Sequence, residues 1–277
     1  MSSLRTGSAA ARMVNWKETF QLSEASMCAV LVVSPHLDDA VLSAGATIAA
    51  LTGQGVDVTV CTVFAGAATP PYSEFARQFH AMCGLGDDAV ARRRQEDLEA
   101  TEILGARSLH LPFLDSIYRQ DEIGSFAALF EAPTDAVLVE QIAQAIHKSF
   151  GDEWPAELWT CAAFGDHVDH RITREAVARV AREHNLKLVL WEDFPYAAGQ
   201  AYSADGQPAT VPAVTPAHLQ QKLEAVARYP SQLAMLYDPE RDWRDGMELD
   251  WRSELLNHAA ERGGSELLWQ AATSQPQ

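Results

Sequence analysis

Short apolar runs alternate with stretches of helical periodicity over most of the chain. Apolar runs rich in β-branched side chains and bounded by turn residues predict strands at residues 29–33, 56–64, 108–111, 157–164 and 186–191. Apolar positions three and four residues apart predict helices at residues 39–52, 89–104, 134–150 and 168–184. In the second of these helices we expect Leu98 on the apolar side. Strands and helices that alternate with short connections favour a mostly parallel sheet covered on both faces.

The regular pattern weakens in three places. Residues 1–24 are mixed in character, and we expect an N-terminal tail there. Residues 65–88 lack clear periodicity, which predicts a loop that helps to select the substrate; the alternative is an ordinary surface loop. Beyond the last predicted strand, prolines and glycines interrupt the pattern, and helical spacing returns only at residues 216–227 and 253–260.

These features predict one folded unit. The chain has 277 residues, of which 47% are hydrophobic, enough for a sizeable core. We expect residues 25–277 to form a single domain, with a core at residues 28–196 and a C-terminal appendage at residues 197–277. The predicted fold class is α/β and Rossmann-like: a mostly parallel sheet with helices on both faces, plus the appendage packed against it.

The charge of the chain narrows the range of partners. A formal net charge of −17 and a pI near 4.8 predict a surface that repels nucleic-acid phosphates and anionic membrane faces. No stretch approaches the ~20 apolar residues that a membrane-spanning helix needs. We therefore expect a soluble, cytoplasmic protein with a small-molecule substrate, no nucleic-acid partner and no membrane association. The sequence leaves open whether the chain forms a homo-oligomer.

The four cysteines are widely spaced and form no CxxC pair. Three of them lie in apolar runs, so we expect buried free thiols of the kind found in reducing compartments. This spacing argues against both a disulfide framework and a zinc site made of thiolates. The four are Cys28, Cys61, Cys83 and Cys161.

The sequence Ser-Pro-His-Leu-Asp-Asp at residues 34–39 stands where a predicted buried strand turns into a helix. His36, Asp38 and Asp39 place one imidazole and two carboxylates there, which can hold a divalent metal and keep a base beside it. The alternative is structural, because aspartates at a helix start commonly cap free N–H groups. A second group of metal ligands is needed to favour the functional interpretation.

Such a group follows the predicted strand at residues 157–164. Residues 165–171 (Gly-Asp-His-Val-Asp-His-Arg) again place His and Asp between a strand and a helix. His167 and His170 are three residues apart and face one side of that helix, so one can bind a metal while the other leans over the site. Taken alone, the pair is as consistent with solvated histidines. Because ligands of open parallel sheets lie outside the carboxyl ends of strands, the two motifs together predict a shared metal site.

The two motifs also resemble those of a known family. Residues 34–45 (SPHLDDAVLSAG) and 165–171 (GDHVDHR) resemble the LmbE/PIG-L family of zinc-dependent N-acetylglucosaminyl deacetylases, which carry His-x-Asp-Asp early and His-x-x-His late. The resemblance covers residues 30–195 and includes an Arg-x-x-Glu pair at Arg93 and Glu96 and a Glu-Asp-x-Pro-Tyr segment at residues 192–196. The family's first motif often continues with Glu. This chain has alanine there, at position 40, so a role for that Glu does not carry over.

Carried over by position, the resemblance implies a metal site and a base. His36, Asp39 and His170 would bind Zn²⁺, or another divalent metal such as Fe²⁺, and leave a fourth position for water. The metal lowers the pKa of that water, so that a nucleophile exists at neutral pH. Asp38 would take the proton of the water and pass it to the departing amine.

Five further positions have implied roles. His167 would stabilise the negative charge that grows on the amide oxygen, with Asp169 as its orienting partner. Arg93 and Asp115 match positions where the family contacts the sugar, and Tyr196 would line the pocket. Each also has a structural alternative. Arg93 is then a solvated charge on a helix, Asp115 a turn former and Tyr196 a packed aromatic ring.

Together the residues predict a metal-dependent amide hydrolase. It would remove an acetyl or small acyl group from the amide nitrogen of an N-acetylated amino-sugar or a related small molecule. One alternative is a non-haem iron oxygenase, which uses the same set of two histidines and one carboxylate. Another is a non-catalytic Rossmann-like binding domain, although no GxGxxG follows a predicted strand. The sequence does not identify the acylated amine or the native metal.

Overall fold

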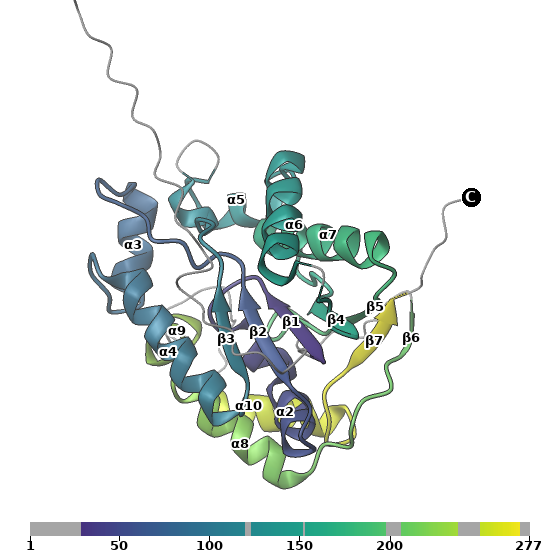
Figure 1. Ribbon diagram of the computed structural model, residues 1–277. Coiled ribbons are helices and arrows are strands. Elements are labelled where there is room, and N and C mark those ends of the chain that lie inside the picture. The colour runs from purple at the N-terminus through teal and green to yellow at the C-terminus, as the bar shows by residue number, and fades with distance from the viewer. Residues whose placement is uncertain (1–28, 120–122, 152, 198–205, 238–249, 272–277) are drawn as a thin grey trace, which may run out of the picture.

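Among the residues that the structure describes, one sheet of seven strands forms the centre (Figure 1). The structure, a computed structural model, describes residues 29–119, 123–151, 153–197, 206–237 and 250–271. The strands are Val30–Ser34 (β1), Val58–Thr62 (β2), Arg107–His110 (β3), Glu157–Cys161 (β4), Lys187–Trp191 (β5), Gly206–Pro208 (β6) and Leu268–Ala271 (β7). Their order is β3-β2-β1-β4-β5-β7-β6. The predicted tail at residues 1–24 and Cys28 lie outside the described residues.

The sheet is mostly parallel, as predicted. Strands β1 to β5 pair in parallel, and β7 runs antiparallel to both of its neighbours, β5 and β6. The helices are Asp39–Gly53 (α2), Glu74–Met82 (α3), Ala89–Ile103 (α4), Phe126–Glu131 (α5), Ala136–Phe150 (α6), Val168–Glu183 (α7), Pro216–Val226 (α8), Pro230–Leu236 (α9) and Trp251–Glu261 (α10). A 3-10 turn, η1, spans Ser116–Tyr118.

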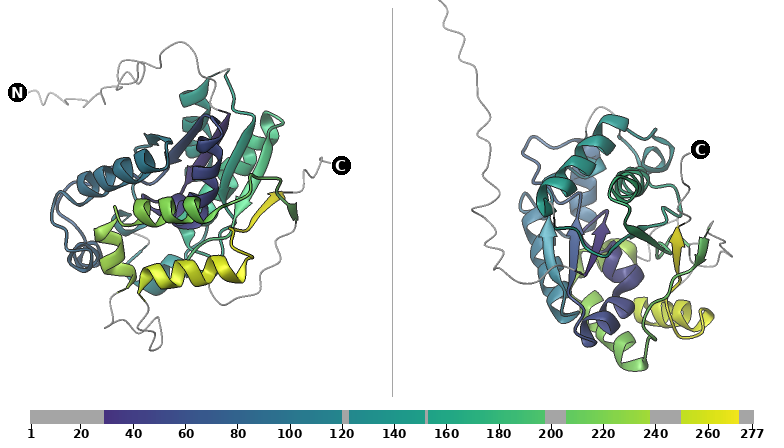
Figure 2. Two further views of the ribbon diagram at one scale, coloured as in Figure 1. Left: turned by 90° about the horizontal axis from the view of Figure 1, so that it is seen from below. Right: turned by 45° about the vertical axis from the view of Figure 1, so that its right-hand side comes forward.

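Apolar side chains fill both faces of the sheet. Along β1, Leu31 and Val33 point into one core with α6 and α7, while Val30 and Val32 point into a second core with α2, α8 and α10. Successive side chains of a strand point to opposite faces, and a parallel sheet buried on both faces therefore reads as a continuous apolar run. Figure 2 shows the two helical layers on opposite sides of the sheet.

Two local expectations were wrong. The stretch expected to be an irregular loop contains helix α3, whose start is capped by Ser73 as it accepts a hydrogen bond from the Ala76 N–H at 3.0 Å. Leu98 is 46% exposed, because the buried side of α4 carries Arg93, Asp97 and Ala100. The inner face of this helix is thus partly polar, which an apolar pattern cannot reveal.

The C-terminal segment extends the sheet as well as packing against it. Strand β7 pairs with β5 through Leu268, and β6 joins the outer edge of β7. Helix α8 packs along α2 and supplies Leu223 and Val226 to the second core. Within the described residues, no helix combines the length and apolarity needed to cross a bilayer.

Candidate active site

Both sequence motifs lie at the carboxyl ends of neighbouring strands, as predicted. The strand order runs from β1 through β2 to β3 on one side and from β4 to β5 on the other, so β1 and β4 flank the point where the order reverses. Ligands of open α/β sheets bind outside this point. The ring centroid of His36 lies 5.0 Å from that of His167 and 5.4 Å from that of His170. The fold thus brings the two motifs into one site.

The first motif directs its carboxylates into the site and does not use them as caps. Ser34 stabilises the turn between β1 and α2. Its hydroxyl donates to the His36 carbonyl at 2.8 Å and accepts from the Ala40 N–H at 3.1 Å. The Asp38 side chain makes no capping hydrogen bond to α2, and Asp39 Oδ2 accepts from the His36 N–H at 2.8 Å. The capping alternative is therefore wrong for Asp38.

The second motif depends on an unusual corner between β4 and α7. Ala163, Gly165 and Asp166 all have left-handed backbone, with φ values of 62°, 85° and 61°. A Cβ on Gly165 would lie 2.8 Å from the Cβ of Tyr196, so this position requires glycine for space as well as for conformation. The ring of His167 follows, and its Nδ1 accepts from the Asp169 N–H at 3.2 Å. A neutral His167 therefore carries its proton on Nε2.

Three side chains form a set of donors suited to a divalent metal. Asp39 Oδ2 lies 3.1 Å from His36 Nδ1 and 3.3 Å from His170 Nε2. Two ligands of one tetrahedral zinc are separated by roughly this distance, about 3.3 Å. His170 Nε2 is fully buried and yet makes no hydrogen bond with any residue that the structure describes, which is rare for a buried polar atom. A metal ion fits this unused nitrogen.

Two other groups of donors within the described residues fit a metal less well. In the group of His36, His167 and Asp169, the Nδ1 of His167 and both oxygens of Asp169 are already occupied by hydrogen bonds. The other group joins Cys161 and Asp193 to His170. The Cys161 thiol already donates to the His170 carbonyl at 3.4 Å, and burial raises its pKa to about 11.

Burial and the local charges shift the pKa values of the two adjacent aspartates in opposite directions. Burial and the neighbouring Asp39 carboxylate raise the pKa of Asp38 to about 7. Burial also disfavours the ionised form of Asp39, but the positive charges of His170 and His36 lower its pKa well below the usual value. Burial opposes protonation of His36 as well, and nearby carboxylates, Asp115 first, nevertheless raise its pKa to about 10. Asp39 is therefore ionised, and Asp38 exchanges a proton near neutral pH.

Asp169 is held by a complete set of hydrogen bonds. Its Oδ1 accepts from Arg119 at 2.6 Å, and its Oδ2 accepts from the Ser116 N–H at 2.9 Å and lies 3.1 Å from His36 Nε2. Burial opposes its ionisation, but these partners keep the pKa of the carboxyl below its usual range. Burial and the charges of His36 and His170 lower the pKa of His167 well below 6.5, so that ring is neutral. No sequence pattern pointed to Arg119, a lone arginine in a loop.

The three predicted substrate-binding residues lie around the site. Arg93 and Asp115 are each 6% exposed, and Nη1 of the arginine lies 3.4 Å from Oδ2 of the aspartate. The alternative of a solvated helix charge is therefore wrong for Arg93. Asp115 is also a turn former, since its Oδ1 accepts from the Ile117 N–H at 3.2 Å. Tyr196 packs 5.4 Å from the ring of His170.

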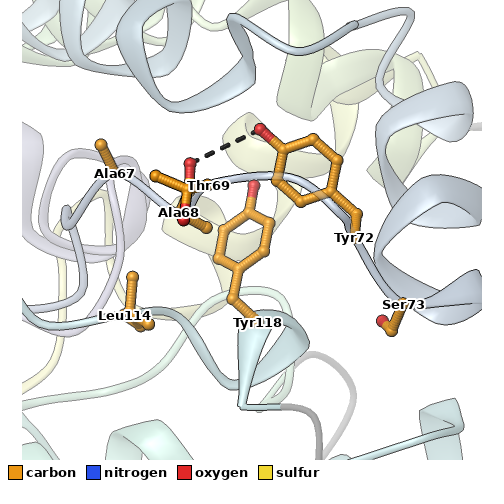
Figure 3. Close-up of a pocket in the computed structure, with 7 residues that line it drawn as sticks. All are labelled: Ala67, Ala68, Thr69, Tyr72, Ser73, Leu114 and Tyr118. Carbon is orange, nitrogen blue, oxygen red and sulfur yellow. Dashed lines mark hydrogen bonds between the residues drawn. The ribbon is translucent and has the colours of Figure 1, made fainter. Parts of the chain in front are cut away.

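Next to η1 lies a small pocket of about 140 Å³. It is lined by residues 67–69, 72 and 73, together with Leu114 and Tyr118 on either side of Asp115 (Figure 3). The rings of Tyr72 and Tyr118 are 6.0 Å apart, and the hydroxyl of Tyr118 lies 2.7 Å from His80 Nε2. The segment predicted to select the substrate thus borders a pocket beside the site.

Sequence and structure comparisons match the chain to known proteins over most of its length. A sequence profile described as PIG-L, GlcNAc-PI de-N-acetylase, matches residues 31–181. The chain is 31% identical over 188 residues to a 2'-N-acetylparomamine deacetylase of Niallia circulans, an alignment that covers 61% of this chain and 67% of that protein.

Two solved structures are similar over nearly their whole length. The A40926 pseudoaglycone deacetylase Dbv21 is 36% identical, with a TM-score of 0.74, and the match covers 91% of this chain and 100% of that one. The zinc-inhibited form of the teicoplanin deacetylase Orf2 is 35% identical, with a TM-score of 0.74, and the match covers 89% of this chain and 99% of that one.

Proposed function

The chain belongs to the PIG-L family of deacetylases, and we propose that it is a metal-dependent N-deacetylase. It removes an acetyl or small acyl group from the amide nitrogen of an N-acylated amino-sugar. One observation carries the proposal: His170 Nε2 is buried without a hydrogen bond from the described part of the chain, and it faces a carboxylate and a second imidazole at the strand ends where both motifs meet.

His36, Asp39 and His170 are the residues that would hold the metal, and Zn²⁺ is the ion that we favour. When bound, it supplies a positive charge that polarises the amide carbonyl and lowers the pKa of a neighbouring water. The protein's own contribution is to keep Asp39 ionised and the two imidazoles fixed. Carboxylates at both ring nitrogens of His36 and at Nδ1 of His170 support that rigid arrangement.

Asp38 acts as the general base. Its pKa of about 7 lies near the pH at which it works, which is the condition for efficient proton transfer in both directions. The carboxylate takes the proton of the attacking water and later gives it to the leaving nitrogen. Its side chain is only 7% exposed, so bulk water does not compete for that proton.

His167 stabilises the negative charge that develops on the amide oxygen. The Asp169 N–H occupies Nδ1, so the neutral ring presents an Nε2 proton to donate. Asp169 fixes this geometry, because it is itself anchored by Arg119 and by the backbone of η1. A preorganised donor costs little reorganisation as the charge forms.

Arg93, Asp115 and Tyr196 bind the sugar. The buried guanidinium and carboxylate offer a donor and an acceptor for sugar hydroxyls, and Tyr196 lines the wall beside His170. The relatives are named as deacetylases of N-acetylparomamine, of the A40926 pseudoaglycone and of teicoplanin. These names support an amino-sugar within a larger molecule as the substrate here. The three buried cysteines among the described residues suit a cytoplasmic location.

The test begins with the purified full-length chain, its metal content and its release of acetate. We expect acetate from N-acetylglucosamine or an N-acetylated aminoglycoside, loss of activity with a chelator, and recovery with Zn²⁺. A metal-loaded protein that releases no acetate from either compound would refute the proposal. Turnover that needs oxygen and a 2-oxo acid would instead favour the iron oxygenase, and a wild type without metal or turnover would favour a binding domain.

A further inference from the structure

The carboxylate of Asp193 contacts the side of His170 that faces away from the other two proposed ligands. Its Oδ1 lies 2.7 Å from Nδ1 of the ring, and its Oδ2 accepts from the Phe164 N–H at 3.0 Å. Asp193 and His170 are each only 1% exposed. Asp193 therefore reaches neither solvent nor substrate, and any influence on the reaction acts through the imidazole.

This contact determines which ring nitrogen is available. A carboxylate accepts hydrogen bonds, so the nitrogen that it contacts carries a proton. With the proton on Nδ1, the lone pair of a neutral His170 is on Nε2, which lies 3.3 Å from Asp39 Oδ2. A hydrogen-bonded carboxylate also makes the imidazole a stronger electron donor and fixes the orientation of the ring.

The chain holds Asp193 in place from both sides. The preceding residue, Glu192, pairs with Arg262 just beyond α10, with an Nη2 to Oε1 distance of 2.7 Å. The following residue, Phe194, donates its N–H to Ser43 Oγ on α2 at 3.1 Å. The segment after β5 is thus tied both to the helix that carries Asp39 and to the C-terminal part of the chain.

We propose that Asp193 is a positioning residue of the metal centre: its carboxylate keeps a proton on Nδ1 of His170 and so presents Nε2 as a ligand. The proposal rests on the proposed function, because it assumes that His170 binds the metal. It also gives the C-terminal segment a part in the site, since Arg262 holds the residue next to Asp193.

The test compares the Zn²⁺ affinity of the wild type, Asp193→Asn and Asp97→Asn as full-length chains, by competition with a chromophoric chelator. Asp97 is a matched control: it is also 1% exposed, and it lies 2.7 Å from His110 Nε2 and accepts from the Tyr229 hydroxyl at 2.8 Å. Neither partner belongs to the proposed ligand set. We expect Asp193→Asn to weaken Zn²⁺ binding by about 10–100-fold. Asp97→Asn should leave it within about twofold, although both variants lose thermal stability.

The outcomes separate the two proposals. Equal Zn²⁺ affinity in the wild type and Asp193→Asn overturns the role of Asp193 and leaves the deacetylase proposal intact. A wild type that neither binds Zn²⁺ nor releases acetate overturns the deacetylase proposal itself. If Asp193→Asn does not fold, NMR of the imidazole nitrogens in the Zn²⁺-loaded wild type decides. We expect a proton on Nδ1 of His170 that is shifted downfield by the carboxylate. Ligation through Nδ1, with the proton on Nε2, would overturn the inference.

Discussion

A buried ion pair lies within the C-terminal segment, and its carboxylate also binds α2, so breaking the pair should destabilise the whole protein. Lys222 Nζ lies 2.6 Å from Glu266 Oε1, and the two side chains are 6% and 4% exposed. Glu266 also accepts from the N–H groups of Ala46 and Thr47 at 3.1 and 2.8 Å, and from the Thr47 hydroxyl at 2.7 Å. The Glu266 carboxylate therefore interacts with four donor groups on two helices, α2 and α8.

The perturbation is Glu266→Gln, which removes the charge and little volume. It leaves the Lys222 ammonium buried without a counter-charge, and removal of one partner from a buried pair costs about 3–5 kcal/mol. In a domain of this size about 1 kcal/mol shifts the melting temperature by roughly 2–4 °C, so the midpoint should fall by about 6–20 °C. Thermal unfolding followed by circular dichroism measures this. Lys222→Met should cost a similar amount, and the double variant should recover part of the loss.

An exposed pair provides the control. Arg77 and Glu74 are 2.5 Å apart but 56% and 71% exposed, so Glu74→Gln should leave the midpoint unchanged. A midpoint for Glu266→Gln no lower than that of the control would refute the reasoning. The same experiment tests the prediction of a single domain over residues 25–277. A single unfolding transition that shifts to lower temperature in Glu266→Gln supports the prediction. Two transitions, of which only one shifts, would contradict it.

Three further predictions concern the site and its support. Asp38→Asn should reduce kcat by about 10²–10⁴-fold while Zn²⁺ content is unchanged, and in the wild type kcat/KM should fall as the pH is lowered and the base becomes protonated; undiminished turnover in the variant would exclude Asp38 as the base. Gly165→Ala should lower both stability and activity, because the new Cβ meets Tyr196 and φ is +85°; a wild-type melting curve would show that the corner adapts. Burial works against ionisation of Glu192, but hydrogen bonds from His258 and Arg262 lower its pKa. A depressed carboxyl pKa adds stability above its unfolded value of about 4.3 and loses it as the pH falls through the folded value. The wild type should therefore melt at a higher temperature than Glu192→Gln at pH 7, and this difference should shrink below about pH 4. A difference that stays constant down to pH 3 would contradict this.

The sequence predicted the sheet and the two motifs because both signals are local. Buried parallel strands are continuous apolar runs, and the ligand-bearing residues directly follow two of those runs, β1 and β4. The partners of these residues carry no such signal. Arg119 lies in a loop, and its contact with Asp169 spans 50 positions. A single charged residue in a loop has no periodicity, so only the folded chain reveals this contact.

The same limit explains the error at helix α4 and why strands β6 and β7 were not among the predicted elements. Asp97 can lie on the buried side of α4 because its two oxygens form hydrogen bonds with His110 and Tyr229. A hydropathy pattern predicts that the same side is exposed to solvent. Strand β7 has only four residues, and only Leu268 and Trp269 among them are buried. A strand so short has too few alternating apolar and polar positions to be recognised in the sequence. Its place in the sheet is determined by pairing with β5.

The adjacent aspartates of the first motif show why the roles of site residues depend on surroundings more than on sequence. Asp38 and Asp39 differ by one position, yet Asp39 accepts from the His36 N–H and lies beside two imidazoles, while no hydrogen bond from a described residue reaches the Asp38 carboxylate. The first arrangement favours the charged form that a metal ligand needs, and the second leaves a carboxyl whose pKa of about 7 suits proton transfer. Neutralising His170 should therefore affect the two aspartates unequally. Asp39 would lose its main source of charge stabilisation, whereas Asp38 would change less, because burial, Asp39, Arg93 and His36 each act on it more strongly than His170 does.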